Sequence, residues 1–322
     1  MAGVGDLRLG EELVMVPAPL ATLEELGRVH DPGYLTELEA FSRRGGGNID
    51  PDTYAGGDSW STAARAAGAG LAALAVLGEK GAGVALVAAR PPGHHAERDR
   101  AMGFCLLNNV AVAAGALRAA GERVLIVDWD VHHGNGTQSI FWDDPGVLYV
   151  STHQWPLFPG TGSALEAGSD RALGTTLNLP LPAGATGDVI RAALEEVAAP
   201  VVERFAPDWV LVSCGFDAHR ADPLGDLALS SGDFARLATV VRRFAPHDGR
   251  TVLFFEGGYD LAAIRASTAA TLGALLGGSW GTEDETFGGP GLEDVRLAGK
   301  VYERVVSRHD EGGSPPLAEG GW

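Results

Sequence analysis

Cysteine is scarce in this chain of 322 residues, because only Cys105 and Cys214 occur and both lie in apolar settings. Two such cysteines argue against a disulfide scaffold and are typical of a protein in a reducing compartment. The first twenty residues lack a basic stretch followed by an apolar one, so the sequence shows no signal peptide. No apolar run is long enough to span a bilayer. These absences predict a cytoplasmic protein without a membrane partner.

Basic residues are also few, because 24 Lys and Arg stand against 42 Asp and Glu, and the net charge is −18. Such acidity disfavours nucleic acid as a partner and attracts cationic substrates, although on its own it is better explained by solubility. The length and composition predict one large α/β domain over residues 1–309, followed by a Gly/Pro-rich disordered tail over 310–322. They leave a homo-oligomer open.

Apolar runs and helix caps alternate along most of the chain. The predicted strands are Val84–Ala88, Arg123–Asp128, Val147–Ser151, Thr175–Leu179, Trp209–Cys214, Val252–Phe255 and, less clearly, Leu13–Val16. The predicted helices cover residues 22–29, 32–41, 60–77, 108–120, 188–204, 230–243 and 260–276, and Gly45–Thr53 is expected to be a flexible loop. Strands that alternate with helices in this way predict parallel βαβ units in one sheet covered on both faces.

One stretch, Arg123–Gln138, combines an apolar run with an unusual density of charge. After Val127 it continues with Asp128, Asp130, His132 and His133. Charges at the end of a buried strand cost several kcal/mol or more unless a metal or a polar network compensates them. If the chain stays extended, Asp128, Asp130 and His132 point the same way, and the last two are candidate metal ligands.

Polar clusters also follow other predicted strands. His94 and His95 follow the strand at Val84, Asp217 follows the strand at Trp209, and Glu256–Tyr259 follows the strand at Val252. Ligands of a parallel sheet bind beyond the carboxyl ends of its strands. We therefore expect these clusters to meet on one rim.

Together, Asp130, His132 and Asp217 would form a site with two carboxylates, one histidine and an open coordination position. Three protein ligands plus water are typical of catalytic zinc, which lowers the pKa of its water and polarises a carbonyl group. Taken alone, Asp217 is better explained as a loop carboxylate, and only the companion ligands overturn that reading.

Two adjacent histidines, His94 and His95, follow a rigid Pro-Pro-Gly segment. A lone buried histidine is more often a hydrogen-bonded core residue, but a tandem pair beside a metal can act as general base and general acid. Asp128 is placed to orient one of them, and Asn135 could orient the other.

A glycine turn ends in Tyr259, whose phenol could donate to a developing oxyanion. Without the other site residues, Tyr259 could equally be a half-buried loop tyrosine. Phe104 and Phe158 could line an apolar tunnel, with core packing as the default. His133 is expected to orient the backbone beside the metal. Structural or surface roles are assigned to His30, His153, His219, His247 and His309. Together, the candidate metal ligands, the histidine pair and Tyr259 predict metal-assisted hydrolysis of an amide.

Several motifs in this order resemble those of the zinc-dependent histone deacetylase family, in its class II-like bacterial branch. They are RPPGHHA (Arg90–Ala96), GFCLLNN (Gly103–Asn109), DWDVHHGNGTQ (Asp128–Gln138), FPGTG (Phe158–Gly162), GFDAHRADPLG (Gly215–Gly225) and EGGYD (Glu256–Asp260). The resemblance implies an arginase-like α/β/α fold with a mostly parallel sheet of about eight strands. It also implies zinc on Asp130, His132 and Asp217, with His95 as general base and Tyr259 polarising the acetyl carbonyl.

The resemblance further implies a potassium site. It would use the carbonyls of Asp128, Asp130 and His132, the Asp128 carboxylate, and Ser151 with Thr152. A second potassium site would lie near Phe141, Asp144 and Val147. One departure from the family is that its usual N-terminal strand and the segment before the first helices are missing or shortened.

Two positions bear on the substrate. The weakly active branch of the family has His in place of the catalytic tyrosine, and this chain keeps Tyr259. The polyamine-specific branch has a glutamate where Leu224 stands, so Leu224 favours an acyl-lysine-like substrate over an acetylpolyamine, and Gly103 is expected beside it in the substrate tunnel.

The alternatives are an acetylpolyamine or other acylamine amidohydrolase, a non-catalytic acyl-lysine-binding protein, and an arginase-like ureohydrolase. The last would need a carboxylate where His219 stands, two residues after Asp217.

Overall fold

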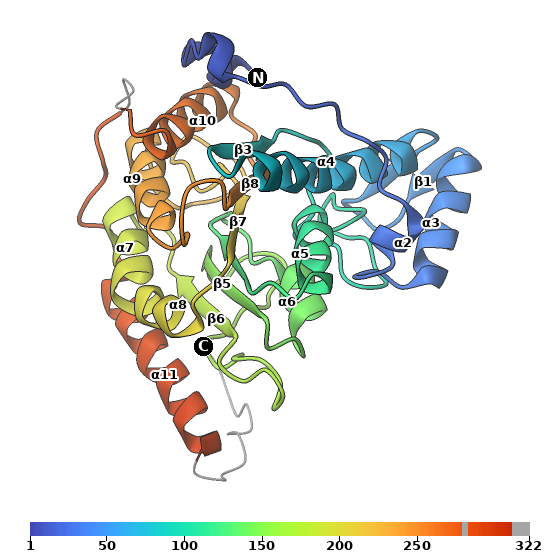
Figure 1. Ribbon diagram of the computed structural model, residues 1–322. Coiled ribbons are helices and arrows are strands. Elements are labelled where there is room, and N and C mark those ends of the chain that lie inside the picture. The colour runs from blue at the N-terminus through green and yellow to red at the C-terminus, as the bar shows by residue number, and fades with distance from the viewer. Residues whose placement is uncertain (279–282, 311–322) are drawn as a thin grey trace.

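A six-stranded sheet forms the centre of the computed structural model, which describes residues 1–278 and 283–310 (Figure 1). Its strand order is β3-β8-β7-β4-β5-β6, and every neighbouring pair is parallel. The strands are β3 (Val84–Val87), β4 (Val124–Asp128), β5 (Val147–Gln154), β6 (Thr176–Leu181), β7 (Trp209–Cys214) and β8 (Thr251–Phe255). The predicted parallel sheet is confirmed, but it has six strands rather than about eight.

Both faces of the sheet are covered. In β4, Leu125 and Val127 pack into one hydrophobic core, whereas Val124 and Ile126 pack into the other. Because alternate side chains enter opposite cores, each central strand reads as an unbroken apolar run. The predicted three-layer α/β/α arrangement is therefore confirmed.

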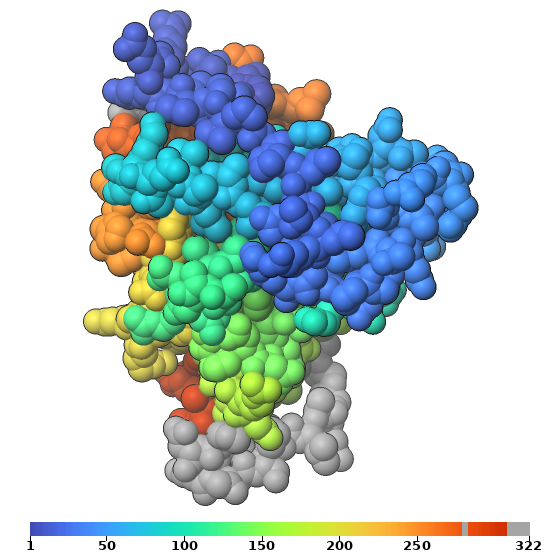
Figure 2. Space-filling model, turned by 45° about the vertical axis from the view of Figure 1, so that its right-hand side comes forward, coloured from blue at the N-terminus to red at the C-terminus, as the bar shows by residue number. Residues whose placement is uncertain are grey.

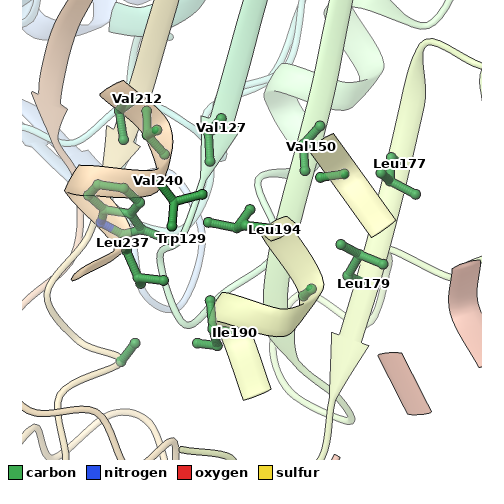
Figure 3. Close-up of a cluster of buried hydrophobic side chains, with 14 of the residues drawn as sticks. Val127, Trp129, Val150, Leu177, Leu179, Ile190, Leu194, Val212, Leu237 and Val240 are labelled. Atoms are coloured by element: carbon green, nitrogen blue, oxygen red, sulfur yellow. The ribbon is translucent and has the colours of Figure 1, made fainter. Parts of the chain in front are cut away.

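Two groups of helices form the outer layers. One core is covered by α7 (Gly187–Ala192), a π-helical turn (Ala193–Ala198), α8 (Ala199–Phe205), α9 (Ser231–Arg242), α10 (Leu261–Leu275) and α11 (Leu292–Asp310). Figure 3 shows part of this core, in which Ile190 and Leu194 pack toward the sheet. The other core is covered by α2 (Leu23–Leu26), α3 (Pro32–Arg43), α4 (Ser59–Lys80), α5 (Asn109–Ala119) and α6 (Asn135–Phe141).

Local sequence signals account for several helix starts. Thr22 with Glu25 and Ser230 with Asp233 form capping boxes at the N-termini of α2 and α9, as their spacing predicted. Helix α11 was not predicted, and it includes Asp310, which had been assigned to the tail. The rest of the predicted tail lies outside the described residues.

The N-terminal part of the chain differs most from prediction. It contains α1 (Ala2–Asp6) and a 3₁₀ turn (Gly10–Glu12), and the expected strand Leu13–Val16 is irregular. Figure 2 shows the blue N-terminal segment lying across the cyan residues of α4, where Ala21 N donates to Ala64 O. A hairpin of β1 (Gly46–Asn48) and β2 (Tyr54–Gly56) interrupts the expected loop.

The prediction that no segment could span a bilayer was wrong for α4, whose 22 residues are long and apolar enough by length and composition. Half of its most apolar 18-residue window is buried in the protein. Packing against α3, α5 and β3 explains this composition, because a helix buried on several sides needs few polar residues. A cytoplasmic location stays a prediction.

Candidate active site

The carboxyl ends of β3, β8, β7 and β4 lie next to one another, and a cavity of ≈ 290 Å³ opens at this edge of the sheet. It is lined by Asp52, Pro92, His94, His95, Gly103, Phe104, Asp130, His132, Leu157, Phe158, Asp217, Leu224, Gly257 and Tyr259. The polar clusters predicted at four strand ends therefore meet on one rim.

Within the cavity, Asp130, His132 and Asp217 each offer one ligand atom, and these atoms lie within 4.8 Å of one another. Nδ1 of His132 lies 3.1 Å from Oδ1 of Asp130 and 3.2 Å from Oδ2 of Asp217. Strand β4 ends at Asp128, so Asp130 and His132 stand on the loop after it and not on an extended strand, and Asp217 stands on the loop after β7. Among the side chains that the structure describes, in residues 1–278 and 283–307, no other group of three His, Cys, Asp or Glu residues has this arrangement.

The charge of this group fits a divalent cation. Burial and the adjacent Asp130 raise the pKa of Asp217, and although burial opposes it, both carboxylates raise the pKa of His132. Oδ2 of Asp217 is buried and lacks a hydrogen bond to any described residue. Two carboxylates and one imidazole are a donor set typical of zinc sites. The oxygen of Asp217 that makes no hydrogen bond is free to bind such an ion.

The backbone of Gly257 approaches these carboxylates closely. Its amide donates to Oδ2 of Asp130 at 2.7 Å. A Cβ at this position would lie 1.9 Å from Oδ2 of Asp217, so any larger residue would displace a ligand.

The tandem histidines have different partners. Nδ1 of His94 donates to Oδ2 of Asp128 at 3.0 Å, and Nδ1 of His95 lies 2.9 Å from Oδ1 of Asn135. The two ring centroids are 4.0 Å apart. Asp128 and Asn135 therefore lie where they could orient the two histidines, as the sequence predicted.

These environments push the two pKa values apart. Burial disfavours charge on His94, but Asp130 and Asp128 raise its pKa well above the usual value. Burial, together with the charge on His94, holds the pKa of His95 well below it. Groups that separate in this way are typical of an acid and base pair.

Aromatic and small residues form the walls of the cavity. The ring of Phe158 lies edge-on to His95 at 5.1 Å, and the ring of Phe104 lies 6.2 Å from that of Tyr259. Gly103 has a φ of +56°, and a Cβ there would lie 2.5 Å from the His95 ring. Phe104, Phe158 and Leu224 are about 40% exposed, so they stand at the mouth and not in the core.

Two buried carboxylates were missed as site residues. Glu256 accepts from the amides of Gly93 and His94, and Asp222 accepts from the amides of Tyr259 at 2.6 Å and Leu224 at 3.1 Å. Glu256 had a signal, because it directly follows the buried strand β8. Asp222 had none that separates it from an ordinary loop carboxylate.

The predicted potassium ligands lie together in part. Asp128 and Ser151 are partners in the register of β4 and β5, and the buried hydroxyl of Thr152 has no hydrogen bond to a described residue. At the second position, Asp144 N donates to Phe141 O and Val147 N donates to Asp144 O.

The histidines assigned outside the site have other surroundings. His219 Nε2 lies 2.8 Å from Glu283 Oε2, which counts against its use in a second metal site. His30 and His153 are buried, His247 is exposed, and the side chain of His309 lies outside the described residues.

Known proteins were compared with this chain as a whole. The histone deacetylase domain family matches residues 4–275. A histone deacetylase-like amidohydrolase of Pseudomonas aeruginosa is 40% identical over 274 residues, which cover 84% of this chain and 72% of the relative. A probable deacetylase of Archaeoglobus fulgidus is 39% identical over 271 residues, which cover 83% of this chain and 75% of the relative.

Plant relatives are longer. Chloroplastic histone deacetylase 10 of rice (Oryza sativa subsp. japonica) is 44% identical over 80% of this chain, and the match spans 61% of the rice protein. Among solved structures, the HDA15 HD domain superposes with a TM-score of 0.84 at 35% identity, covering 96% of this chain and 88% of that one. An acetylpolyamine aminohydrolase from Burkholderia pseudomallei gives 0.77 at 32% identity, covering 85% and 89%.

Proposed function

Because this chain belongs to the histone deacetylase family, as its motifs predicted, we propose that it is a zinc-dependent deacetylase acting on an acetyl-lysine-like amide. The observation that carries the proposal is the convergence of the Asp130, His132 and Asp217 group with a histidine pair and Tyr259 on one cavity. A zinc ion held by those three ligands would lower the pKa of a bound water and polarise the substrate carbonyl.

The two histidines have different roles in this mechanism. His95 is neutral because burial and the nearby His94 lower its pKa, so it takes the proton from the attacking water. His94 is held as a cation by Asp128 and Asp130, so it stabilises the negative charge that develops beside it. His95, once protonated, then donates to the departing amine.

The phenol of Tyr259 donates to the developing oxyanion. Burial and the nearby Asp130 raise its pKa, so the hydroxyl keeps its proton at neutral pH. Asp222 holds the Tyr259 amide, and Phe104 with Phe158 would enclose the aliphatic part of the substrate.

We also propose that potassium binds beside β4. The buried, unpaired hydroxyl of Thr152 next to Ser151 supports this, because such a hydroxyl needs a partner.

Hydrolysis of an acetylpolyamine or another small acylamine is a second candidate. The carboxylate of Asp52 lines the cavity, and the net charge of −18 favours a cationic substrate. Leu224 at the mouth adds no second carboxylate, which favours the acyl-lysine substrate.

The test is a turnover screen of the zinc-loaded protein over acetyl-lysine peptides, longer acyl-lysine peptides and acetylpolyamines, with and without a chelator. We expect chelator-sensitive hydrolysis that is fastest on an acyl-lysine peptide. Preference for an acetylpolyamine would support the second candidate. Peptide binding without turnover, in protein carrying one zinc ion per chain by elemental analysis, would overturn the enzymatic proposal.

A further inference from the structure

We propose that Glu97 is a positioning residue that fixes the tautomer of His95 through the side-chain amide of Asn135. The effect of Glu97 on turnover rests on the proposed function, whereas its effect on the tautomer does not. The three side chains form a chain of hydrogen bonds that leads from the cavity to the half-buried carboxylate.

The surroundings of Asn135 determine which way its amide points. Nδ2 of Asn135 donates to Oε1 of Glu97 at 2.8 Å, and the Sδ of Met102 at 3.3 Å and the carbonyl oxygen of His95 at 3.4 Å surround it. All three neighbours are acceptors, and a carboxylate has no proton to offer. The amide nitrogen must therefore face Glu97, because the opposite orientation would set oxygen against oxygen.

This orientation decides the protonation of the imidazole. Oδ1 of Asn135 faces Nδ1 of His95 at 2.9 Å, and an amide oxygen only accepts hydrogen bonds. Nδ1 must then carry the hydrogen, so the neutral ring keeps its lone pair on Nε2. A general base that takes a proton from water in the cavity needs this tautomer.

The main chain of Glu97 is itself held in place. Asn108 N donates to Nε2 of His30 at 2.9 Å, so His30 carries its hydrogen on Nδ1, which donates to the Glu97 carbonyl at 3.0 Å. The amide of Glu97 donates to the Arg100 carbonyl at 2.9 Å. The carboxylate is thus aimed at Asn135 by a fixed loop.

The two tandem histidines are therefore oriented by different means. His94 contacts the carboxylate of Asp128 directly, which favours the charged ring. The neutral amide of Asn135 stands between His95 and Glu97, so the distant charge orients the ring without pairing directly with it.

The direct test is long-range ¹H–¹⁵N NMR of histidine-labelled protein, with and without zinc, with His95 assigned from a His95→Gln variant. We expect the parent to show hydrogen on Nδ1 of His95. Glu97→Ala removes the main acceptor, so both tautomers become populated. An unchanged His95 signal in a folded Glu97→Ala variant would overturn the proposal.

An exchange of donor and acceptor gives a sharper test. Asn135→Asp places a second carboxylate against Glu97, and we expect a loss of turnover. Adding Glu97→Gln supplies a donor to the carboxylate introduced at position 135, which removes the repulsion and returns its other oxygen to the place where it accepts from Nδ1 of His95. The double variant should therefore be more active than Asn135→Asp alone, and a double variant that is no better would overturn the proposal.

Turnover of a fluorogenic acetyl-lysine peptide measures the consequence. We expect Glu97→Ala to lower kcat about 10-fold to 100-fold, with KM and zinc content nearly unchanged. Glu97→Gln keeps an acceptor, so its loss should be smaller, and Asp99→Ala is the control carboxylate from the same loop. If the parent itself shows no turnover, the proposed function fails while the NMR result still decides the role of Glu97.

Discussion

Two groups of buried histidines lie next to each other in this protein, and their surroundings differ. In the active-site group, His94 and His132 face the carboxylates of Asp128, Asp130 and Asp217. Charge accumulates there, and Oδ2 of Asp217 makes no hydrogen bond to a described residue. This group needs a cation to be complete.

The second group consists of His133 and His153, and its polar atoms have neutral partners. His133 lies between the hydroxyl of Thr161 and the amide of Gln138. His153 contacts the hydroxyl of Ser151 and the carbonyl oxygen of Gly162. The difference indicates that converging carboxylates, and not the number of histidines, distinguish the candidate metal site.

The largest expected effect on turnover comes from substituting a candidate zinc ligand of the active-site group. Asp217→Asn keeps the shape of the side chain but removes its charge, so zinc affinity should fall and turnover should drop by on the order of 10³-fold. Zinc content by elemental analysis and kcat/KM on an acetyl-lysine peptide measure this. The exposed Asp170→Asn is the matched control, and a variant that retains zinc would contradict the assignment.

A somewhat smaller loss of turnover, without loss of zinc, is expected from a substitution in the same cavity that leaves the zinc ligands in place. Tyr259→Phe removes the oxyanion donor, so kcat should fall by about 10²-fold to 10³-fold while zinc content stays the same. Steady-state kinetics with parallel metal analysis test this. Parent-like kcat in the phenylalanine variant would remove Tyr259 from the mechanism.

The second group should affect stability in acid. Burial lowers the pKa of His153 to about 4, against about 6.5 in an unfolded chain. Between these values only the unfolded chain binds the proton, so this contribution is complete above about pH 6.5 and is lost as pH falls toward 4. The loss is about 3 kcal/mol.

Urea unfolding of the metal-free protein between pH 4 and pH 7 measures this difference. His153→Gln should lack that part of the acid dependence, with His247→Gln, an exposed histidine, as the control. Identical slopes for the parent and His153→Gln would contradict a buried neutral His153.

The smallest expected effect concerns His133. His133→Leu removes the hydrogen bonds to Thr161 and Gln138, while Gln138 keeps those to Glu166 and Asn178, so the free energy of unfolding should fall by about 1 kcal/mol. Zinc content should not change, although the candidate ligand His132 directly precedes His133 in the chain. A loss of zinc as large as that of Asp217→Asn would show that His133 contributes to metal binding and would contradict the distinction between the two groups.

The parallel sheet, the helix caps and the candidate ligands could be predicted from local patterns of residues, although the number of strands could not. The run Val124–Val127 is apolar on both faces because both faces are covered. The capping residues Thr22 and Ser230 act within four residues of chain, so a local pattern is enough to find them. Charges placed directly after buried strands, as at Asp130 and His132, mark a site because nothing local can compensate them.

The residues that support the site could be found only from the folded chain. Glu97 and Asp222 bond to segments that lie 38 and 37 residues away, so no local spacing distinguishes them from surface carboxylates. Glu256 follows a buried strand, but its partner Gly93 lies 163 residues away. The number of strands, the β1–β2 hairpin and the burial of α4 likewise depend on which surfaces pack together. Hydrogen bonding and packing between distant segments are not encoded in any short stretch of chain, and they fix the orientation of His95 that the proposed chemistry requires.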